Sequence, residues 1–297
     1  MKKFIYIAVA VILATSLVPG INYSAPAGFM EIILESPGAS PEQTIDAEAV
    51  LSKRLKAFGV TAFETEVRPE QRQISIRFQD PLPAETILPL LSSTGKLEFC
   101  EVFTQPEILR ILNAPGQEEA WKQWFALDTE AAEMQPVLGS ITPEEIPGFS
   151  EFVISQLAAK ALPDNLRFAL GHASGTEGQR EAYALRYSEG MEPLLTGAAV
   201  ESSVAHYDEQ AGMASIGIRF NEEGSAQWAK ATRDNIHRPI AIVFDGLVYF
   251  APRVMAEMTS GQAQITGDFS KEETRLIAAL IQGGELPAPF QVKTVKQ

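Results

Sequence analysis

The chain has 297 residues, of which 45% are apolar, so it can bury a sizeable core in one or two domains. The formal net charge is −14, and no basic run follows the first three residues. Because phosphate binding needs clustered Lys and Arg, nucleic acid is excluded as the expected partner. The single cysteine, Cys100, cannot form an internal disulfide, and we interpret it as a buried or half-buried strand residue.

Residues 1–27 have the pattern of a targeting segment. Met1-Lys2-Lys3 is a short basic start, and the run from Phe4 to Val18 is apolar and uncharged. This run fits the core of a signal peptide and is short for a membrane span of about 20 residues. Small residues suited to cleavage stand at Ser24–Ala27, although Pro26 makes the site poor. We expect export, with residues 1–27 serving either as a cleaved signal peptide or as an N-terminal membrane anchor.

Residues 29–102 alternate between strand and helix patterns. The expected elements are a strand at Met30–Leu34, a helix that Pro41–Thr44 leads into and that ends at Phe58, strands at Val60–Val67 and Gln73–Phe78, a helix at Pro83–Leu91 and a strand at Lys96–Val102. Gly59 occupies the usual C′ position after the first helix. The order βαββαβ is that of a ferredoxin-like fold, which has two helices on one face of an antiparallel sheet. That fold hosts many functions and decides none of them.

The middle of the chain contains an aromatic group, Trp121, Trp124 and Phe125, at the end of an expected helix over 106–125. We favour a core or inter-helix contact for these rings. The alternative is an exposed apolar patch that contacts an unfolded polypeptide, which makes them the candidate contact residues. A second helix is expected over 148–161, and a turn-rich loop over 171–179.

Catalytic and metal-binding patterns are missing from the sequence. His172 and Ser174 lie in the turn-rich loop without a Gly-x-Ser-x-Gly elbow, and they are ordinary loop content. His172, His206 and His237 have no metal-type spacing to another ligand. There is no P-loop and no dinucleotide fingerprint. We therefore expect no enzyme activity, no metal and no cofactor.

The last third of the chain carries the clearest local signals. Asn221 is expected to cap a helix that contains Trp228, and Ile240–Phe244 and Leu247–Phe250 form a hairpin around Asp245-Gly246. Pro252 ends the second strand, Gly261 and Gly267 bracket another strand, and Ser270 caps a helix with one apolar face. Gly283-Gly284 is expected to stop that helix, Pro287 to stiffen a hinge at Leu286–Pro289, and Phe290–Val295 to add a strand to the N-terminal sheet.

Three phrases in this region stand in a recognisable order: IAIVFDGLVYFAP, GQAQITGDF and IAALIQGGELPAP. Together with KRLKAFGV and STGKLEFCEV in the first third, they resemble the large first periplasmic domain of SecD, a membrane-embedded accessory subunit of the bacterial protein-export channel. The resemblance covers about residues 29–102 and 180–294. It leaves 103–179 unmatched.

The resemblance implies an α+β protein with a ferredoxin-like βαββαβ base and an inserted α+β head subdomain. The base would comprise 29–102 and 288–295, and the head 103–287, of which 180–287 is well matched and 103–179 poorly matched. The implied location is the periplasm, in a form that is free or membrane-anchored. The implied activity is non-enzymatic binding of unfolded or translocating polypeptide, with base and head moving as rigid bodies, and export-channel membrane subunits as a further partner.

This sequence also departs from the SecD pattern. The family continues into five further membrane spans that couple the domain to the proton gradient, and this chain stops at Gln297. The family phrase GLDLkGG is missing after the first apolar segment. An alternative therefore stays open, in which the chain is an envelope interaction or scaffolding domain that binds a folded partner and has no transport role.

Overall fold

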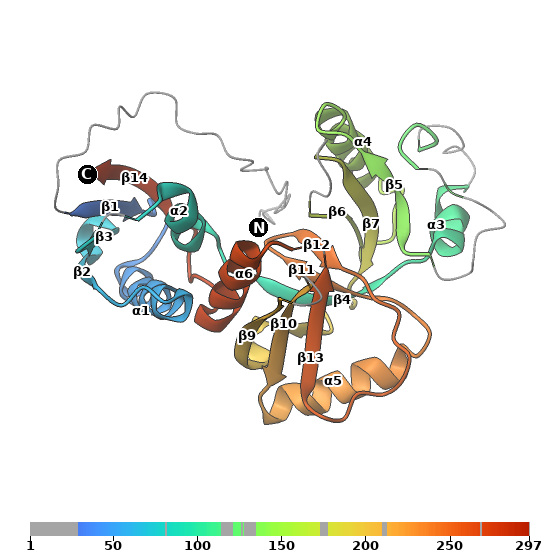
Figure 1. Ribbon diagram of the computed structural model, residues 1–297. Helices are drawn as coiled ribbons and strands as arrows, with labels where there is room; N and C mark the ends of the chain where they lie inside the picture. The colour runs from blue at the N-terminus through green and yellow to red at the C-terminus, as the bar shows by residue number, and fades with distance from the viewer. Residues whose placement is uncertain are drawn as a thin grey trace. The chain divides into compact units, whose positions relative to one another are not determined.

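The computed structural model describes residues 29–80, 82–113, 121–125, 127, 135–172, 178–209, 213–267 and 269–296. Their contacts divide the chain into two compact units. Figure 1 labels the helices and strands that make them up. Unit 1 comprises 97–199 and 221–262, and unit 2 comprises the described residues up to 96 together with 200–220 and 263–296. The predicted signal or anchor segment and Ser174 lie outside the described residues. No helix of the described ranges is long and apolar enough to cross a membrane.

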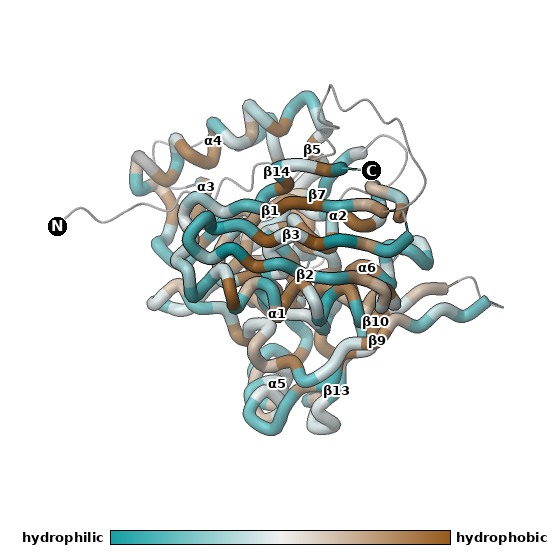
Figure 2. The backbone as a smooth tube through the Cα atoms, turned by 90° about the vertical axis from the view of Figure 1, so that its left-hand side faces the viewer, coloured by the Kyte–Doolittle hydropathy of each residue, from teal (hydrophilic) through white to brown (hydrophobic). Residues whose placement is uncertain are grey.

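Unit 2 contains a four-stranded antiparallel sheet in the order β14-β1-β3-β2, whose strands lie side by side in Figure 2. The strands are β1 (Met30–Glu35), β2 (Phe63–Arg68), β3 (Gln73–Phe78) and β14 (Gln291–Lys296). The two central strands pair Met30 with Phe78, Ile32 with Ile76 and Leu34 with Ile74, and all six side chains are fully buried. This alternation of buried residues fixes the register, because a slip of one residue would expose the whole set.

Two helices and a short 3₁₀ turn connect these strands: α1 (Pro41–Phe58), η1 (Pro69–Gln71) and α2 (Ala84–Ser92). A capping box begins α1, since the Ser40 hydroxyl accepts from Gln43 N and the Gln43 side chain accepts from Ser40 N. Gly59 ends α1 with a left-handed φ of 97°. The predicted end of the first helix at Phe58 is confirmed, and the second helix, predicted at Pro83–Leu91, lies one residue later at Ala84–Ser92.

The place predicted for the strand at Lys96–Val102 is wrong. The structure has this strand as β4 (Leu97–Val102), and it pairs with β11 (Ile240–Phe244) in unit 1. The position beside β1 is taken by β14. The burial pattern explains the exchange: Phe99, Cys100 and Val102 are fully buried, as suits a central strand, whereas β14 alternates between exposed and half-buried residues, as suits an edge.

A second sheet of unit 2 has three strands in the order β13-β10-β9. They are β9 (Val200–Asp208), β10 (Met213–Phe220) and β13 (Gln262–Gly267). The helix α6 (Lys271–Gly283) packs between this sheet and α1, because Ser203 Oγ donates to Ala278 O at 3.1 Å and Arg275 Nη2 donates to Phe58 O at 2.9 Å. The Ser270–Glu273 capping box begins α6.

The buried side chain of Arg54 joins three elements of unit 2. From α1 its guanidinium donates to the carbonyl oxygens of Leu90, Ser93, Thr94 and Gly284, at 2.7–3.1 Å. Gly283 leaves room for this side chain, since a Cβ there would stand 2.1 Å from Arg54 Cγ. Gly283 is the last helical residue of α6, and Gly284, with φ 89°, is the C-cap.

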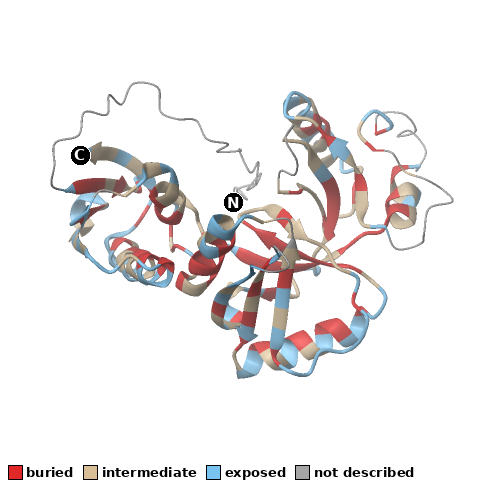
Figure 3. Ribbon diagram, in the orientation of Figure 1, coloured by how far each residue is buried: buried red, intermediate tan, exposed pale blue. Residues whose placement is uncertain are grey.

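Unit 1 is built on one larger sheet, with the path β12-β11-β4-β7-β5. Besides β4 and β11 its strands are β5 (Val137–Ile141), β6 (Leu166–Leu170), β7 (Arg180–Arg186), β8 (Leu195–Thr196) and β12 (Leu247–Phe250). Strand β6 pairs with β7, and β8 pairs with β4. Every residue of β11 is buried, and β11 and β4 are mostly red in Figure 3. Asp245 and Gly246 turn the β11–β12 hairpin with φ values of 48° and 79°.

The helices of unit 1 are α3 (Gln105–Leu112), α4 (Ile146–Ala158) and α5 (Glu222–Asp234), with a 3₁₀ turn η2 (Gly197–Ala199). Asn221 caps α5, since its side chain accepts from Gly224 N. The helix predicted over 106–125 ends earlier, at Leu112, and residues 121–124 form a turn. Pro106 and the Thr104–Glu107 capping box explain where α3 begins, and the C-cap residue Asn113, followed in the sequence by Pro115-Gly116, explains where it ends.

Candidate functional site

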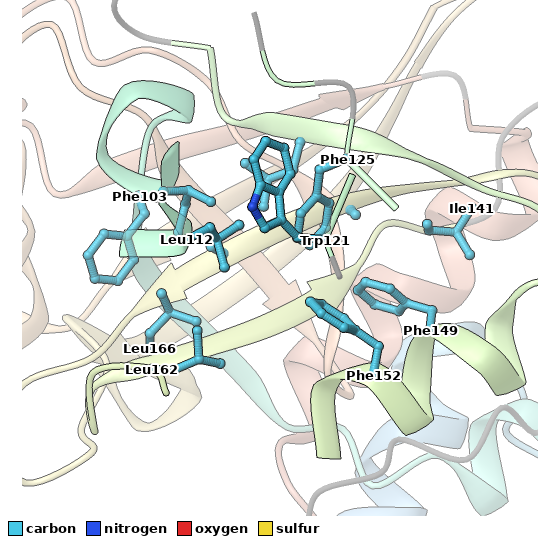
Figure 4. Packing of buried hydrophobic residues seen from close by; sticks show 13 residues of the cluster. Phe103, Leu112, Trp121, Phe125, Ile141, Phe149, Phe152, Leu162 and Leu166 are labelled. Atoms are coloured by element: carbon cyan, nitrogen blue, oxygen red, sulfur yellow. The ribbon is translucent and has the colours of Figure 1, made fainter. Parts of the chain in front are cut away.

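The aromatic residues predicted as polypeptide contacts lie in a hydrophobic cluster of unit 1, shown in Figure 4. Trp121 and Phe125 keep 6% and 4% of their surface exposed, and Trp124 is half-buried. The Phe125 ring lies 5.2 Å from Phe168, 6.0 Å from Phe149 and 6.1 Å from Phe152, measured between centroids. This burial favours the core interpretation of the three residues. Their contact with an unfolded chain stays a prediction that the burial counts against.

Helix α4 is fitted closely to this cluster. A Cβ at Gly148 would stand 3.0 Å from Cη2 of Trp124, so the first turn of α4 lies against the indole ring. The indole Nε1–H groups of Trp121 and Trp124 are buried without a hydrogen-bond partner among the described residues. A buried donor left unpaired costs about 1–3 kcal/mol of stability.

A charged cluster lies at the start of α3, beside the ring of Phe103. Glu107 accepts hydrogen bonds from Arg186 Nη2 at 2.7 Å, from Arg238 Nη2 at 2.9 Å and from Thr104 N at 2.8 Å. Burial raises the pKa of Glu107, but the hydrogen bonds from Thr104 and the two arginines outweigh it and lower the pKa to about 2. Glu107 is therefore ionised at neutral pH, and its charge is matched on two sides.

The same cluster joins four elements of unit 1. Arg186, at the end of β7, also approaches Glu101 of β4 at 3.7 Å, and its guanidinium carbon lies 4.0 Å from the centroid of the Phe103 ring. Arg238 precedes β11 and Glu107 begins α3. Because each charge has a partner, the arrangement holds these elements together and contains no free acid, base or nucleophile.

The other residues singled out from the sequence occupy structural positions. The His172 ring stacks on Tyr249 at 4.5 Å between centroids, and His172 N donates to Val248 O at 2.8 Å. Gly261 has φ +67°, and a Cβ there would stand 2.5 Å from Ser225 Oγ. The carbonyl oxygens of Pro252 and Pro287 accept from Ile240 N and Gln43 Nε2. Within the described ranges, no three His, Cys, Asp or Glu side chains lie close enough to hold a metal ion.

Strand β9 is a feature that the sequence patterns did not predict. Its sequence, VESSVAHYD, has no regular alternation of apolar and polar residues. In the structure β9 is a nine-residue edge strand, with Val204 and Tyr207 exposed at 53% and 42%. The β-branched and aromatic residues Val200, Val204 and Tyr207 were the available signal.

Comparison with known proteins identifies the region that holds β9, Arg186 and Arg238, whereas the three predicted aromatic residues and Glu107 lie before it. Residues 173–288 match the family model described as the SecDF P1 head subdomain. The chain contains a SecD-family domain. The predicted resemblance to SecD is thereby confirmed. The predicted boundary between base and head stays a prediction, because the two compact units cut across it: residues 200–220 and 263–287 belong to the same unit as the N-terminal sheet.

Several relatives share this domain with the chain. It is 40% identical over 104 residues to the protein translocase subunit SecDF of Thermus thermophilus. This match covers 35% of this chain and 14% of the relative. The chain is 40% identical over 99 residues to SecD of Acidaminococcus fermentans, covering 33% and 24%. The SecD-family domain of this chain thus spans a quarter or less of these two proteins.

Two solved structures resemble the chain over most of its length. A structure described as "Structure and function of a membrane component SecDF that enhances protein export" covers 90% of this chain and 99% of its own, with 25% identity and a TM-score of 0.53. A crystal structure of SecDF in a super-membrane-facing form covers 90% of this chain and 30% of its own, with 24% identity and a TM-score of 0.55, which shows the shared fold.

Proposed function

We propose that this chain is a non-enzymatic, extracytoplasmic protein that binds unfolded polypeptide in or near the protein-export pathway. The observation that carries the proposal is the match of residues 173–288 to the SecDF P1 head subdomain, together with the structural likeness over 90% of the chain to a SecDF component described as enhancing protein export. The curated relatives are named protein translocase subunits. Their role is transport rather than chemistry, which supports the absence of an enzymatic step.

The strand order of unit 2 supports a ferredoxin-like base. In β14-β1-β3-β2, the C-terminal strand β14 takes the position that the fourth strand of βαββαβ would occupy, and α1 and α2 are the two helices of that order. We therefore place 29–96 and 288–296 in the base and keep 103–287 as the head, with β4 leading from one to the other.

The charge distribution suggests which polypeptides bind best. Residues 97–199 contain 16 Asp and Glu against 6 Lys and Arg, a net charge of −10 out of the −14 of the whole chain. Opposite charges steer association and raise its rate. Unfolded segments rich in Lys and Arg should therefore bind faster and more tightly than acidic ones. The proposed location of this binding is the periplasmic side of the membrane.

The proposal is tested with the full chain and a client that can be held unfolded by reduction of its disulfides. We expect saturable binding of the reduced client, followed by fluorescence anisotropy, and no binding of the same client in its folded, oxidised form. Binding of neither form would overturn the proposal, and so would equal binding of both forms. Crosslinking in intact cells that recovers one stoichiometric folded partner, and no nascent or unfolded chains, would instead favour the scaffolding alternative.

A further inference from the structure

Strand β9 presents a long open edge. It is the last strand of the sheet β13-β10-β9, as Figure 1 shows, and in the described part of the chain no other strand pairs with its outer side. Its pairing with β10 runs without a break from Met213↔Asp208 to Arg219↔Ser202. Proteins usually shorten, bulge or cover such edges because the backbone groups along them can pair with another chain.

The contacts of Ser203 show which backbone groups face outward. Ser203 N donates to Oε1 of Gln282 in α6 at 2.9 Å and so does not point toward β10. Because the direction of these groups alternates along a strand, Ala205 and Tyr207 also point their N–H and C=O groups away from β10. The amide oxygen of Gln282 therefore holds the position that the first acceptor of an incoming strand would take.

Side chains beside this edge offer apolar contacts on both faces of the sheet. Ser203 faces α6, since its hydroxyl donates to Ala278 O, so Tyr207 lies on that face and Val204 on the opposite one. Val204 is 53% exposed and Tyr207 is 42% exposed. Lys271 Nζ lies over the Tyr207 ring, 5.3 Å from its centroid. An extended segment along β9 could therefore place alternate apolar residues against each of them.

The charges at the ends of β9 narrow the choice of occupant. Glu201, Asp208 and Glu209 are exposed acidic residues. If two copies of β9 paired antiparallel about Ala205, the middle one of the outward-facing residues, Glu201 of each would lie opposite Glu209 of the other. Like charges opposite each other are destabilising, so a second copy of this chain is disfavoured, whereas an extended segment with Lys or Arg near its ends is complementary.

We infer that the outer edge of β9 binds an extended segment of unfolded polypeptide as an added antiparallel or parallel strand. The inference rests on the proposed function and names how the polypeptide is held: the backbone groups of Ala205 and Tyr207 supply hydrogen bonds that do not depend on sequence, and Val204, Tyr207 and the acidic ends select apolar and basic residues. Strand addition of this kind is a common mode of peptide recognition.

The test uses the variant Ala205→Pro in the full chain. Proline removes the outward N–H of residue 205, and it is tolerated in edge strands where that N–H faces solvent. Ala205→Val is the matched control, because it adds bulk and keeps the N–H. The probe is a labelled peptide of alternating Val and Lys. A second peptide has the same sequence and carries backbone N-methyl groups on alternate residues. We expect Ala205→Val to bind like wild type, and Ala205→Pro to weaken binding about tenfold or more, equivalent to about 1.4 kcal/mol.

The outcomes separate this inference from the proposed function. If wild type binds the reduced client and Ala205→Pro binds it equally well, strand addition at β9 is overturned while the proposed function stands. If wild type binds no unfolded client, both fail. The N-methylated peptide keeps the test valid even if Ala205→Pro unfolds, since wild type should bind it at least about tenfold more weakly. A wild-type dimer seen in sedimentation and lost in Ala205→Pro would make a second copy the occupant and overturn the inference.

Discussion

At the scale of single residues, Arg54 is the side chain on which unit 2 depends most. It is fully buried, and its guanidinium donates to four carbonyl oxygens from the ends of α2 and α6 and the residues after α2. Those carbonyls are acceptors that their helices leave open. A shorter or uncharged side chain at this position would leave several of them buried without donors.

Arg54→Leu is therefore expected to lower the free energy of unfolding by about 3 kcal/mol or more, because bonds to a charged donor are worth about 1.5–3 kcal/mol each and the carbonyls would stay buried. Urea denaturation followed by circular dichroism measures this change. Arg68→Ala is the matched control: Arg68 pairs with Glu66 at the surface, and its loss should leave the free energy of unfolding nearly unchanged. Equal effects of the two substitutions would contradict the role given to Arg54.

Glu107 should make stability depend on acid pH. Its folded-state pKa of about 2 lies below the ordinary value of 4.5, so it contributes stability that is fully present above pH 4.5 and is lost as the pH falls toward 2. We expect Glu107→Gln to be less stable than wild type by about 2 kcal/mol at pH 7, and the difference to shrink between about pH 5 and about pH 2. Denaturant midpoints across this range measure it, and a pH-independent difference would refute the assignment.

At the scale of elements, α6 is the helix whose close approach to α1 shapes unit 2. Gly283 at its end meets the side-chain stem of Arg54, and no larger residue fits, since a Cβ would stand 2.1 Å from Arg54 Cγ and 3.2 Å from Arg54 N. The helix also bonds to β9 through Ser203 and Gln282. One helix thus supports the N-terminal helix layer and the edge strand at the same time.

Gly283→Ala should destabilise the protein by about 1–3 kcal/mol, the cost of forcing extra volume into a packed contact. Gly38→Ala is the matched control, because a Cβ at Gly38 has no atom within 4 Å. Thermal melts of both variants compare them under one condition. If the Gly283→Ala and Gly38→Ala variants had the same melting temperature, α6 would be able to move away from α1 at little cost in stability.

Local sequence signals predicted most helices and strands, whereas the sheet that each strand joins depends on residues far away in the sequence. Ser270, Asn221 and Gly59 act as caps and Asp245-Gly246 turns a hairpin, because each depends on a few adjacent residues. The pairing of β4 with β11 depends on burial of both faces, which short apolar runs do not reveal. Strand β9 has only its β-branched and aromatic residues as a local signal, and its open edge depends on pairing with β10, which no local pattern reveals.

At the scale of the whole molecule, the acidic balance is the property most open to measurement. A net charge of −14 attracts basic polypeptides, and mobile ions screen that attraction at distances beyond about 8 Å at physiological ionic strength. This charge is carried mainly by residues 97–199, so its effect on binding should act over long range and through the association rate.

Binding of a basic unfolded client should therefore weaken by about tenfold when salt rises from about 0.05 M to about 0.5 M, chiefly through a slower association rate. Stopped-flow fluorescence with the full chain separates association from dissociation. An unfolded client of similar length with acidic residues in place of Lys and Arg is the control, and it should bind faster at high salt than at low salt. A salt-insensitive association rate for the basic client would contradict electrostatic steering.

The pairing of β1 with β14 has a consequence for the order of folding. Glu31 lies opposite Lys296, so the first and last strands of the described chain share one sheet. Contacts between residues so distant in sequence form slowly, because a long loop must close before they gain anything. A chain that emerges from a ribosome or a membrane channel N-terminus first must hold the edge of β1 open until β14 has emerged. Until then that edge is exposed to mispairing.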